Sequence, residues 1–335
     1  MMSEFVKPIV VISKCIEFDY CRWNGNIIRS PIVEFMKTYF NFKPICAESE
    51  IGLGVPRHPV RLELTDGELS MIQPKTNNNL TNNMNEFSRQ FINSLKEVDG
   101  FILKSDSPSC GVYNVKHYLR NKKNEVYIKE RGFGLFAKAI LEHYPFSAIE
   151  TEGRLRNFRI REHYLTKLYI LAEYRVTSKS KKISKLIEFH TKNKYLFMAY
   201  NQNELRNMGR LLANQKDFPL DQLISKYKKM LDVILSYPPK YTSNINVLMH
   251  MLGYFSKELT TEEKAFFLDE LEKYRAGWIP LFVCTNLIKL WISKYNELYL
   301  RDQSFLNPFP NELMNFDLKD TWRGRDYWKT PEKRS

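Results

Sequence analysis

The segment Pro8-Ile-Val-Val-Ile-Ser13 near the start of the chain is a short run of apolar, mostly β-branched residues. Such a run is typical of a strand buried on both faces of a parallel sheet. Further strands are expected at residues 42–45 and 100–104, a loop at residues 75–83, and helices at residues 31–40, 84–95 and 133–143. This alternation predicts an α/β domain over residues 1–150, with a Rossmann-like parallel sheet covered by helices.

The pattern changes after Gly153 to long segments of helical periodicity with few strand candidates. The clearest helical segments are residues 158–173, 183–200, 220–235, 244–255 and 262–274. We therefore expect an all-α domain over residues 151–320. Residues 321–335, which include Trp322 and Trp328, are expected to form an extended tail on the surface.

Charge is distributed unevenly along the 335 residues. Lys and Arg number 51 against 38 Asp and Glu, a formal net charge of +13, and aromatic residues make up 14%. Residues 1–150 contain 19 Lys and Arg against 17 Asp and Glu, so the remaining 32 and 21 give the C-terminal part a net charge of +11. A surface this basic attracts polyanions such as nucleic acids, although a solvated helical face rich in lysine explains the charge equally well.

The cysteine count and the hydropathy pattern bear on the compartment. Five cysteines, an odd number in a chain of this length, do not form a disulfide framework, and no leader of the secretory type precedes Pro8. The most apolar stretches are far shorter than the ~20 residues needed to cross a bilayer. We therefore expect a cytoplasmic protein without a membrane span.

Three cysteines, Cys15, Cys46 and Cys110, each follow one of the expected strands. The carboxyl ends of parallel strands lie along one edge of a sheet, so these three loops are expected to converge. Three thiolates suit zinc or an iron–sulfur cluster and leave one coordination position for substrate. Spacing alone leaves open the alternative that each is a small buried apolar residue, and leaves open whether Cys21 is a fourth ligand. Cys284 is expected in the helical core.

The loops that carry these cysteines also hold groups suited to proton transfer. Ser107-Pro-Ser-Cys-Gly111 places two hydroxyls beside one thiol, and Cys46-Ala-Glu48 places a carboxylate two residues after another. Gly52-Leu-Gly-Val-Pro-Arg57 follows, in which two glycines allow backbone to approach a ligand closely. Arg57 can bind a phosphate or carboxylate through two N–H groups, and a structural turn with a surface arginine is the alternative.

Together these motifs resemble a known family. The motifs Ser13-Lys-Cys15, Cys21-Arg-Trp-Asn-Gly25, Cys46-Ala-Glu48 with Gly52-Leu-Gly-Val-Pro-Arg57, and Leu103-Lys-Ser-Asp-Ser-Pro-Ser-Cys-Gly111 are similar to the thiouracil desulfidase (TudS-like) domain over about residues 6–150. Residues 151–315, with Glu152-Gly-Arg-Leu155 and Asn246-Val-Leu-Met-His250, resemble the helical domain often fused behind it. The whole arrangement resembles bacterial desulfidases that act on 4-thiouridine in transfer RNA.

The resemblance implies a site and a reaction. Cys15, Cys46 and Cys110 would hold a 4Fe-4S cluster with one iron open to substrate, and Glu48 and Ser107 would form the acid–base pair. Iron acting as a Lewis acid on the thiocarbonyl sulfur would let water attack the ring carbon, releasing sulfide. This hydrolytic reaction is not a redox reaction, so neither a reductant nor a nucleotide cofactor is expected.

A base in folded RNA must leave its stack before it reaches such a site, at a cost of a few kcal/mol that contacts to the RNA backbone must offset. The basic residues expected to bind RNA are Arg154, Arg156, Arg159, Arg161, Lys181, Lys182 and Lys185. His190 and His250 are weighed as RNA contacts, but a histidine in an apolar helix is more often part of the core.

Other functions remain in competition. The same chemistry on a free thiolated base or nucleotide is the nearest alternative. A non-catalytic iron–sulfur protein that binds RNA and senses redox state, and a zinc hydrolase built from the same three thiolates, are the others. No Walker motif, triple-glycine phosphate loop or Ser/His/Asp arrangement of recognisable spacing is found, so nucleotide hydrolysis and acyl transfer are disfavoured.

Overall fold

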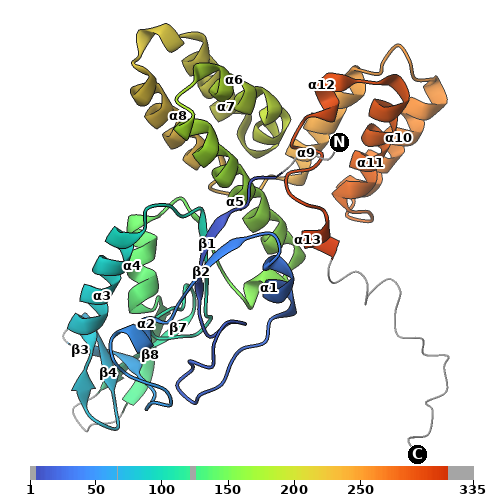
Figure 1. The fold of residues 1–335 in the computed structure, drawn as a ribbon. Helices are drawn as coiled ribbons and strands as arrows, with labels where there is room; N and C mark the ends of the chain where they lie inside the picture. Colours follow the sequence, from blue (N-terminus) through green and yellow to red (C-terminus); the bar gives the residue numbers. More distant parts are fainter. Residues whose placement is uncertain (1–4, 66, 121–125, 316–335) are drawn as a thin grey trace, which may run out of the picture. The chain divides into compact units, whose positions relative to one another are not determined.

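The structure, a computed structural model, describes residues 5–65, 67–120 and 126–315 (Figure 1). The chain divides into two compact units. Unit 1 is formed by the described residues up to 172 together with those from 310 onward, and unit 2 by residues 173–309. Unit 1 is the α/β part of the chain, and unit 2 is helical.

A four-stranded parallel sheet forms the centre of unit 1, with the strand order β2-β1-β6-β9. Its strands are β1 (Ile9–Ser13), β2 (Asn41–Ile45), β6 (Gly100–Leu103) and β9 (Ala148–Thr151). The three strands expected from the sequence are confirmed, and β9 is added at the edge. Val10, Val11 and Ile12 are fully buried, as expected for a β-branched strand in the middle of such a sheet.

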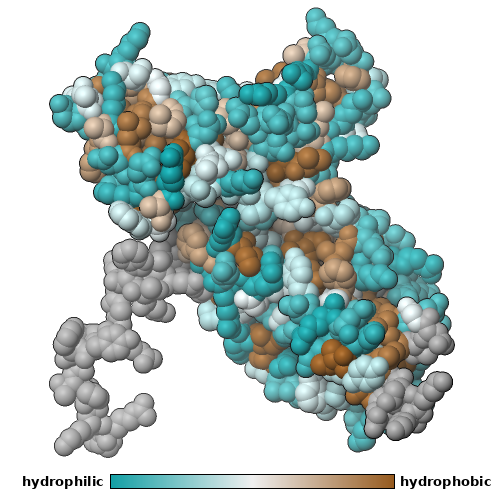
Figure 2. Space-filling view, turned by 180° about the vertical axis from the view of Figure 1, so that it is seen from behind, coloured by the Kyte–Doolittle hydropathy of each residue, from teal (hydrophilic) through white to brown (hydrophobic). Residues whose placement is uncertain are grey.

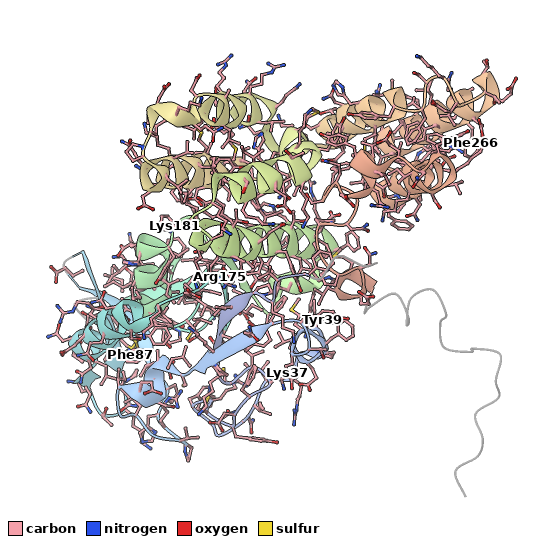
Figure 3. The ribbon with its side chains drawn as sticks, turned by 45° about the horizontal axis from the view of Figure 1, so that its top comes forward. Lys37, Tyr39, Phe87, Arg175, Lys181 and Phe266 are labelled. Carbon is pink, nitrogen blue, oxygen red and sulfur yellow. The ribbon has the colours of Figure 1, made fainter. Side chains whose placement is uncertain are left out.

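The helices of unit 1 follow the expected order with different ends. They are α1 (Pro31–Met36), α2 (Ala47–Glu50), α3 (Thr81–Ser94) and α4 (Leu135–His143). The prediction that the first helix reaches residue 40 is wrong, because Tyr39 and Phe40 turn back onto Met36 and lead directly into β2. Phe87 of α3, labelled in Figure 3, packs against Phe136 of α4 with 5.8 Å between ring centroids.

A second, five-stranded sheet in unit 1 was not predicted. It has the order β5-β4-β3-β7-β8, and only the β3–β7 pair is parallel. Its strands are β3 (Arg61–Thr65), β4 (Glu68–Gln73), β5 (Asn78–Asn79), β7 (Val115–Arg120) and β8 (Val126–Gly132). The strand β8 is largely exposed and carries Lys129, Glu130 and Arg131, so it lacks the apolar pattern of a buried strand. The loop expected at residues 75–83 holds β5 and the start of α3 instead.

The expected all-α character of the C-terminal part is confirmed. The helices are α5 (Phe158–Lys179), α6 (Ile183–Lys192), α7 (Lys194–Ala213), α8 (Leu220–Ile234), α9 (Tyr241–Gly253), α10 (Thr261–Arg275), α11 (Leu281–Tyr295), α12 (Leu298–Arg301) and α13 (Glu312–Asn315). The predicted helices that correspond to α8, α9 and α10 begin and end within three residues of the observed bounds. The helix α5 begins at the predicted residue and extends six residues further than expected. The start of α10 is fixed by a capping box, in which the Thr260 and Glu263 side chains each bind the other's backbone N–H.

The single helix predicted over residues 183–200 is wrong, because α6 and α7 meet at Asn193. This residue is fully buried, and its side-chain amide donates to the carbonyl of Phe189, which ends α6. The carboxamide oxygen accepts a hydrogen bond from Ser304. The break therefore depends on a contact with a residue more than a hundred positions away, which helical periodicity does not reveal.

The surface in Figure 2 is mostly hydrophilic, with apolar residues in separate patches. Within the described ranges, no helix combines the length and apolarity that a membrane crossing requires. The predicted surface tail at residues 321–335 lies outside the described residues.

Candidate functional site

Three loops at the carboxyl ends of neighbouring strands bring the cysteines together. Cys15 follows β1, Cys46 directly follows β2, and Cys110 lies on the loop after β6. All three line one cavity of about 370 Å³ in unit 1, together with Cys21. The convergence expected from the parallel sheet is therefore present in the structure.

Cys21 lies at the same cavity as the three expected ligands. It is buried, and its thiol hydrogen-bonds to the thiols of both Cys15 and Cys46. Its hydrogen bond with Cys15 is the main cause that raises the pKa of Cys21 to about 11. The structure therefore places a fourth thiol between two of the three expected ligands. Cys284, in contrast, is fully buried in α11, as expected for a core residue.

The thiols of Cys46 and Cys110 are also held in the neutral form. The hydrogen bond with Cys21, and then burial, raises the pKa of Cys46. Burial raises the pKa of Cys110 to about 12, although hydrogen bonds from Ser13 and Ser109 act in the opposite direction. Because a thiol binds iron or zinc as thiolate, metal loading at neutral pH must displace these protons.

The donors at the cavity are thiols. Across the residues that the structure describes, no three His, Cys, Asp or Glu side chains are placed to hold a single metal ion together. A cuboidal iron–sulfur cluster takes each thiolate on a different iron, so three thiols around one cavity are compatible with such a cluster. Ser49 Oγ also donates to Cys46 Sγ at 3.2 Å, the kind of hydrogen bond that tunes such clusters.

Glu48 projects into the same cavity from the short helix α2. Arg57 donates to Glu48 Oε2 from both Nε and Nη2 at 2.8 Å, and the Arg57 side chain is only 4% exposed. The sequence predicts that Arg57 can bind a carboxylate. The carboxylate it binds in the structure is that of Glu48, a residue of the protein itself. A buried, charge-assisted pair of this kind fixes the orientation of Glu48.

The two expected acid–base groups are connected through a residue that the sequence analysis did not assign a role. Ser109 Oγ donates to Glu48 Oε1 at 2.5 Å, and Ser107 Oγ lies 3.0 Å from Ser109 Oγ. Ser107 Oγ also accepts from the backbone N–H of Cys110 at 3.1 Å. The result is a continuous chain of hydrogen bonds from Arg57 to Ser107 along the cavity wall. The Ser-Pro-Ser spacing was the available signal for Ser109.

Glycines on these loops serve two different purposes. A Cβ on Gly111 would lie 2.3 Å from Val115 Cγ2 and 2.8 Å from the carbonyl oxygen of Ser107, so this position must be glycine for the serine loop to close. Gly52 has a φ of +87°, and a Cβ there would meet no atom within 4 Å. Gly52 is therefore required for its backbone conformation, and not because another part of the protein lies close to it.

The expected RNA-binding arginines fall in unit 1. Arg154 forms an ion pair with Glu150 at 2.8 Å and lies over the ring of Tyr113. Arg156 and Arg159 are exposed.

The assignment of Arg161 to RNA binding is wrong, because the side chain is 2% exposed. Its guanidinium donates to the backbone carbonyls of Leu155 and Met314. Arg161 therefore ties the start of α5 to the C-terminal helix α13 and is not accessible to a phosphate.

The expected lysines lie on the exposed turn between α5 and α6 and on the first turn of α6. Lys181, labelled in Figure 3, pairs with Asp221, and Lys185 pairs with Glu188 at 2.7 Å. Lys182 is exposed. Surface ion pairs of this kind are weak, so these lysines remain accessible to phosphates.

The two histidines that were weighed as RNA contacts, His190 and His250, differ in exposure. His190 is half-buried and its Nδ1 lies 3.1 Å from the Tyr227 hydroxyl, which gives it a structural contact in the core of unit 2. His250 is exposed on α9.

Two parts of the chain are similar to known protein families. Residues 10–152 match the family model of 2-thiouracil desulfurase, and residues 194–310 match the model of a protein family of unknown function, DUF1722. The two matches cover different parts of the chain, and all residues that line the cavity lie within the first.

Two individual proteins are similar to parts of the chain. The uncharacterized protein YbgA of Escherichia coli K12 is 29% identical over 155 residues, covering 46% of this chain and 89% of that protein. A solved structure of a [4Fe-4S]-dependent thiouracil desulfidase, TudS, shares 19% identity at a TM-score of 0.34, covering 45% of this chain and 94% of that chain.

Proposed function

We propose that this protein is an iron–sulfur-dependent desulfidase that converts 4-thiouridine in transfer RNA to uridine and releases sulfide. The observation that carries the proposal is the meeting of Cys15, Cys46 and Cys110 in one cavity with Glu48, held by Arg57. The match of residues 10–152 to the 2-thiouracil desulfurase family supports the reaction class. The five free cysteines agree with a reducing, cytoplasmic setting.

Cys15, Cys46 and Cys110 would hold a 4Fe-4S cluster, because three thiols around one cavity suit such a cluster and leave one iron open to substrate. Bound there, the cluster would supply an iron that acts as a Lewis acid toward the thiocarbonyl sulfur. The overall reaction is balanced without an oxidant or reductant. Water supplies the oxygen of the new carbonyl and two protons, and the sulfur leaves as hydrogen sulfide.

The residues of this chain would handle the protons. Glu48 is placed to accept a proton from the attacking water, because its carboxylate lies on the cavity wall and is oriented by Arg57 and Ser109. Ser107, at the far end of the hydrogen-bond chain, is placed to contact the ring or pass a proton toward the leaving sulfur.

Binding of RNA would come from the basic surface. Arg156, Arg159 and Lys182 are exposed. Among the described residues Arg156 and Lys182 have no ion-pair partner, and Arg159 interacts electrostatically with the carboxyl group of Glu162. Exposed charges of this kind are available to phosphates. Arg154, Lys181 and Lys185 would add to the footprint by exchanging weak ion pairs for phosphate contacts.

The experiment compares substrates on the full chain purified without oxygen. Transfer RNA containing 4-thiouridine, 4-thiouridine 5′-monophosphate and 4-thiouracil are supplied in turn, and loss of the thiocarbonyl absorption and sulfide release are followed. The proposal expects the highest kcat/KM with transfer RNA. A preference for the free base would replace the RNA substrate with a small molecule. Binding of RNA by a brown protein without turnover would favour a redox sensor.

A further inference from the structure

A tight turn at the rim of the cavity presents two side chains that the proposed chemistry does not use. Arg22 and Trp23 both line the cavity, and Trp23 is nevertheless 45% exposed. Exposure of a large aromatic ring beside a cavity costs apolar burial and is typical of a binding surface. Arg22 and Trp23 are therefore placed to contact a ligand that lies partly inside and partly outside the cavity.

Backbone hydrogen bonds hold the turn, so the backbone of Arg22 and Trp23 is placed at the rim without a ligand. The N–H of Gly25 donates to the Arg22 carbonyl at 2.9 Å, and the Arg22 N–H donates to the Asn26 carbonyl at 3.3 Å. The backbone N–H of Arg57 donates to the Trp23 carbonyl at 2.8 Å. The same arginine that orients Glu48 thus also fixes the turn at the rim.

Arg22 is set apart by its charge environment. Of the other three cations of the cavity lining, Arg57 and Lys104 form largely buried ion pairs with Glu48 and Glu152, and Lys14 forms an exposed ion pair with Asp19. The side chain of Arg22 has no acceptor among the described residues.

The only other carboxylate on the lining besides Glu48 is that of Asp106, which is exposed. The lining thus carries four cationic side chains and two carboxylates. An unpaired guanidinium in this setting favours an anion, and phosphate matches its two-pronged geometry.

We propose that Arg22 and Trp23 form a nucleotide subsite: Arg22 binds the phosphate of the nucleotide whose thiolated base enters the cavity, and Trp23 stacks on a flanking base. The inference rests on the proposed desulfidase function and assigns its substrate class as phosphorylated nucleotides. A mononucleotide and an RNA share the phosphate contact. Only an RNA supplies the flanking base, so the two side chains distinguish the two sources.

The test uses the full chain with its cluster and three substrates: 4-thiouridine, 4-thiouridine 5′-monophosphate and a short RNA containing 4-thiouridine. Arg22→Gln should lower kcat/KM for the monophosphate and the RNA about tenfold to a hundredfold, and leave the nucleoside unchanged. Trp23→Ala should lower kcat/KM about tenfold or more for the RNA alone. Arg29→Gln and Tyr20→Ala, exposed residues of the same loop that do not line the cavity, are the matched controls.

Binding is measured separately by calorimetry with uridine and uridine 5′-monophosphate, so that the result does not depend on turnover. The wild type should bind the monophosphate more tightly, and Arg22→Gln should abolish that preference. Equal affinity of the wild type for both ligands, or an equal loss for both in Arg22→Gln, would overturn the subsite. A phosphate preference in binding, combined with no sulfide from any thiolated substrate, would refute the desulfidase function and leave the subsite standing.

Discussion

Ser109 Oγ donates a 2.5 Å hydrogen bond to Glu48 Oε1, and the two residues lie 61 positions apart in the chain, Glu48 on α2 and Ser109 on the loop after β6. Ser109 is 1% exposed, so this bond is shielded from water and holds the carboxylate on the side opposite Arg57. Ser109 is thus a positioning residue for the proposed base.

Ser109→Ala should lower kcat about tenfold to a hundredfold with little change in KM, because a misoriented base slows the chemical step and leaves ground-state binding intact. Steady-state kinetics with a thiolated nucleotide provide the measurement. The visible absorption of the cluster should match the wild type. A rise in KM at unchanged kcat would show that Ser109 serves substrate binding instead.

Glu48→Gln should retain the cluster and lose turnover about a hundredfold or more, since an amide cannot accept the proton from water. Iron and sulfide content and sulfide release are measured on the same preparation. The control is Glu50→Gln, an exposed carboxylate of the same helix. A colourless Glu48→Gln protein would contradict the role assigned to Glu48.

The cysteine variants test the ligand set. Cys15→Ala, Cys46→Ala and Cys110→Ala should each lose iron and visible absorption, whereas Cys284→Ala should keep both, because Cys284 lies in a helix of unit 2. Cys21→Ala decides the role of the fourth thiol: retained iron with an unchanged spectrum makes it a neighbour of the ligands, and lost iron makes it a ligand. Retention of the full cluster in Cys46→Ala would remove Cys46 from the set.

Charge reversal tests the RNA footprint. Arg156→Glu and Arg159→Glu should weaken binding of transfer RNA, and each lost phosphate contact should reduce the slope of log K against log salt by about 0.9 or less. Affinities are measured over a series of salt concentrations, with Arg89→Glu, an exposed arginine of α3, as control. Unchanged affinity and slope would take both arginines out of the interface.

Acid should destabilise the protein through His190. Burial, reinforced by the nearby Lys194, lowers the pKa of His190 to about 4 from 6.5. As the pH falls below 6.5, His190 takes up its proton in the unfolded chain before it does so in the folded protein. The stability contributed by the neutral, buried His190 is therefore present above pH 6.5 and is lost as the pH falls toward 4. The loss reaches roughly 3 kcal/mol. His190→Gln should flatten the dependence of the thermal midpoint on pH in this window, and His250→Gln, at an exposed position of α9, should not.

The sequence predicts the parallel sheet and the loops after its strands because buried strands have an unmistakable apolar pattern. It does not predict the second sheet, because exposed strands such as β8 carry charged residues and lack the apolar pattern of a buried strand. The burial of Arg161 depends on its contact with Met314, 153 residues away, and could not be read from the local basic cluster. The role of Ser109 likewise depends on how its loop meets Glu48 on α2, 61 positions away in the chain.

The most direct test of the account is the stoichiometry of the reaction without oxygen or added reductant. Full-length protein is mixed with transfer RNA containing 4-thiouridine, and the lost thiocarbonyl absorption, the uridine formed and the sulfide released are all quantified. The account predicts one uridine and one sulfide for each 4-thiouridine consumed, with neither product formed by Cys110→Ala. Loss of 4-thiouridine only when a reductant is added, or no loss by an iron-loaded protein, would contradict it.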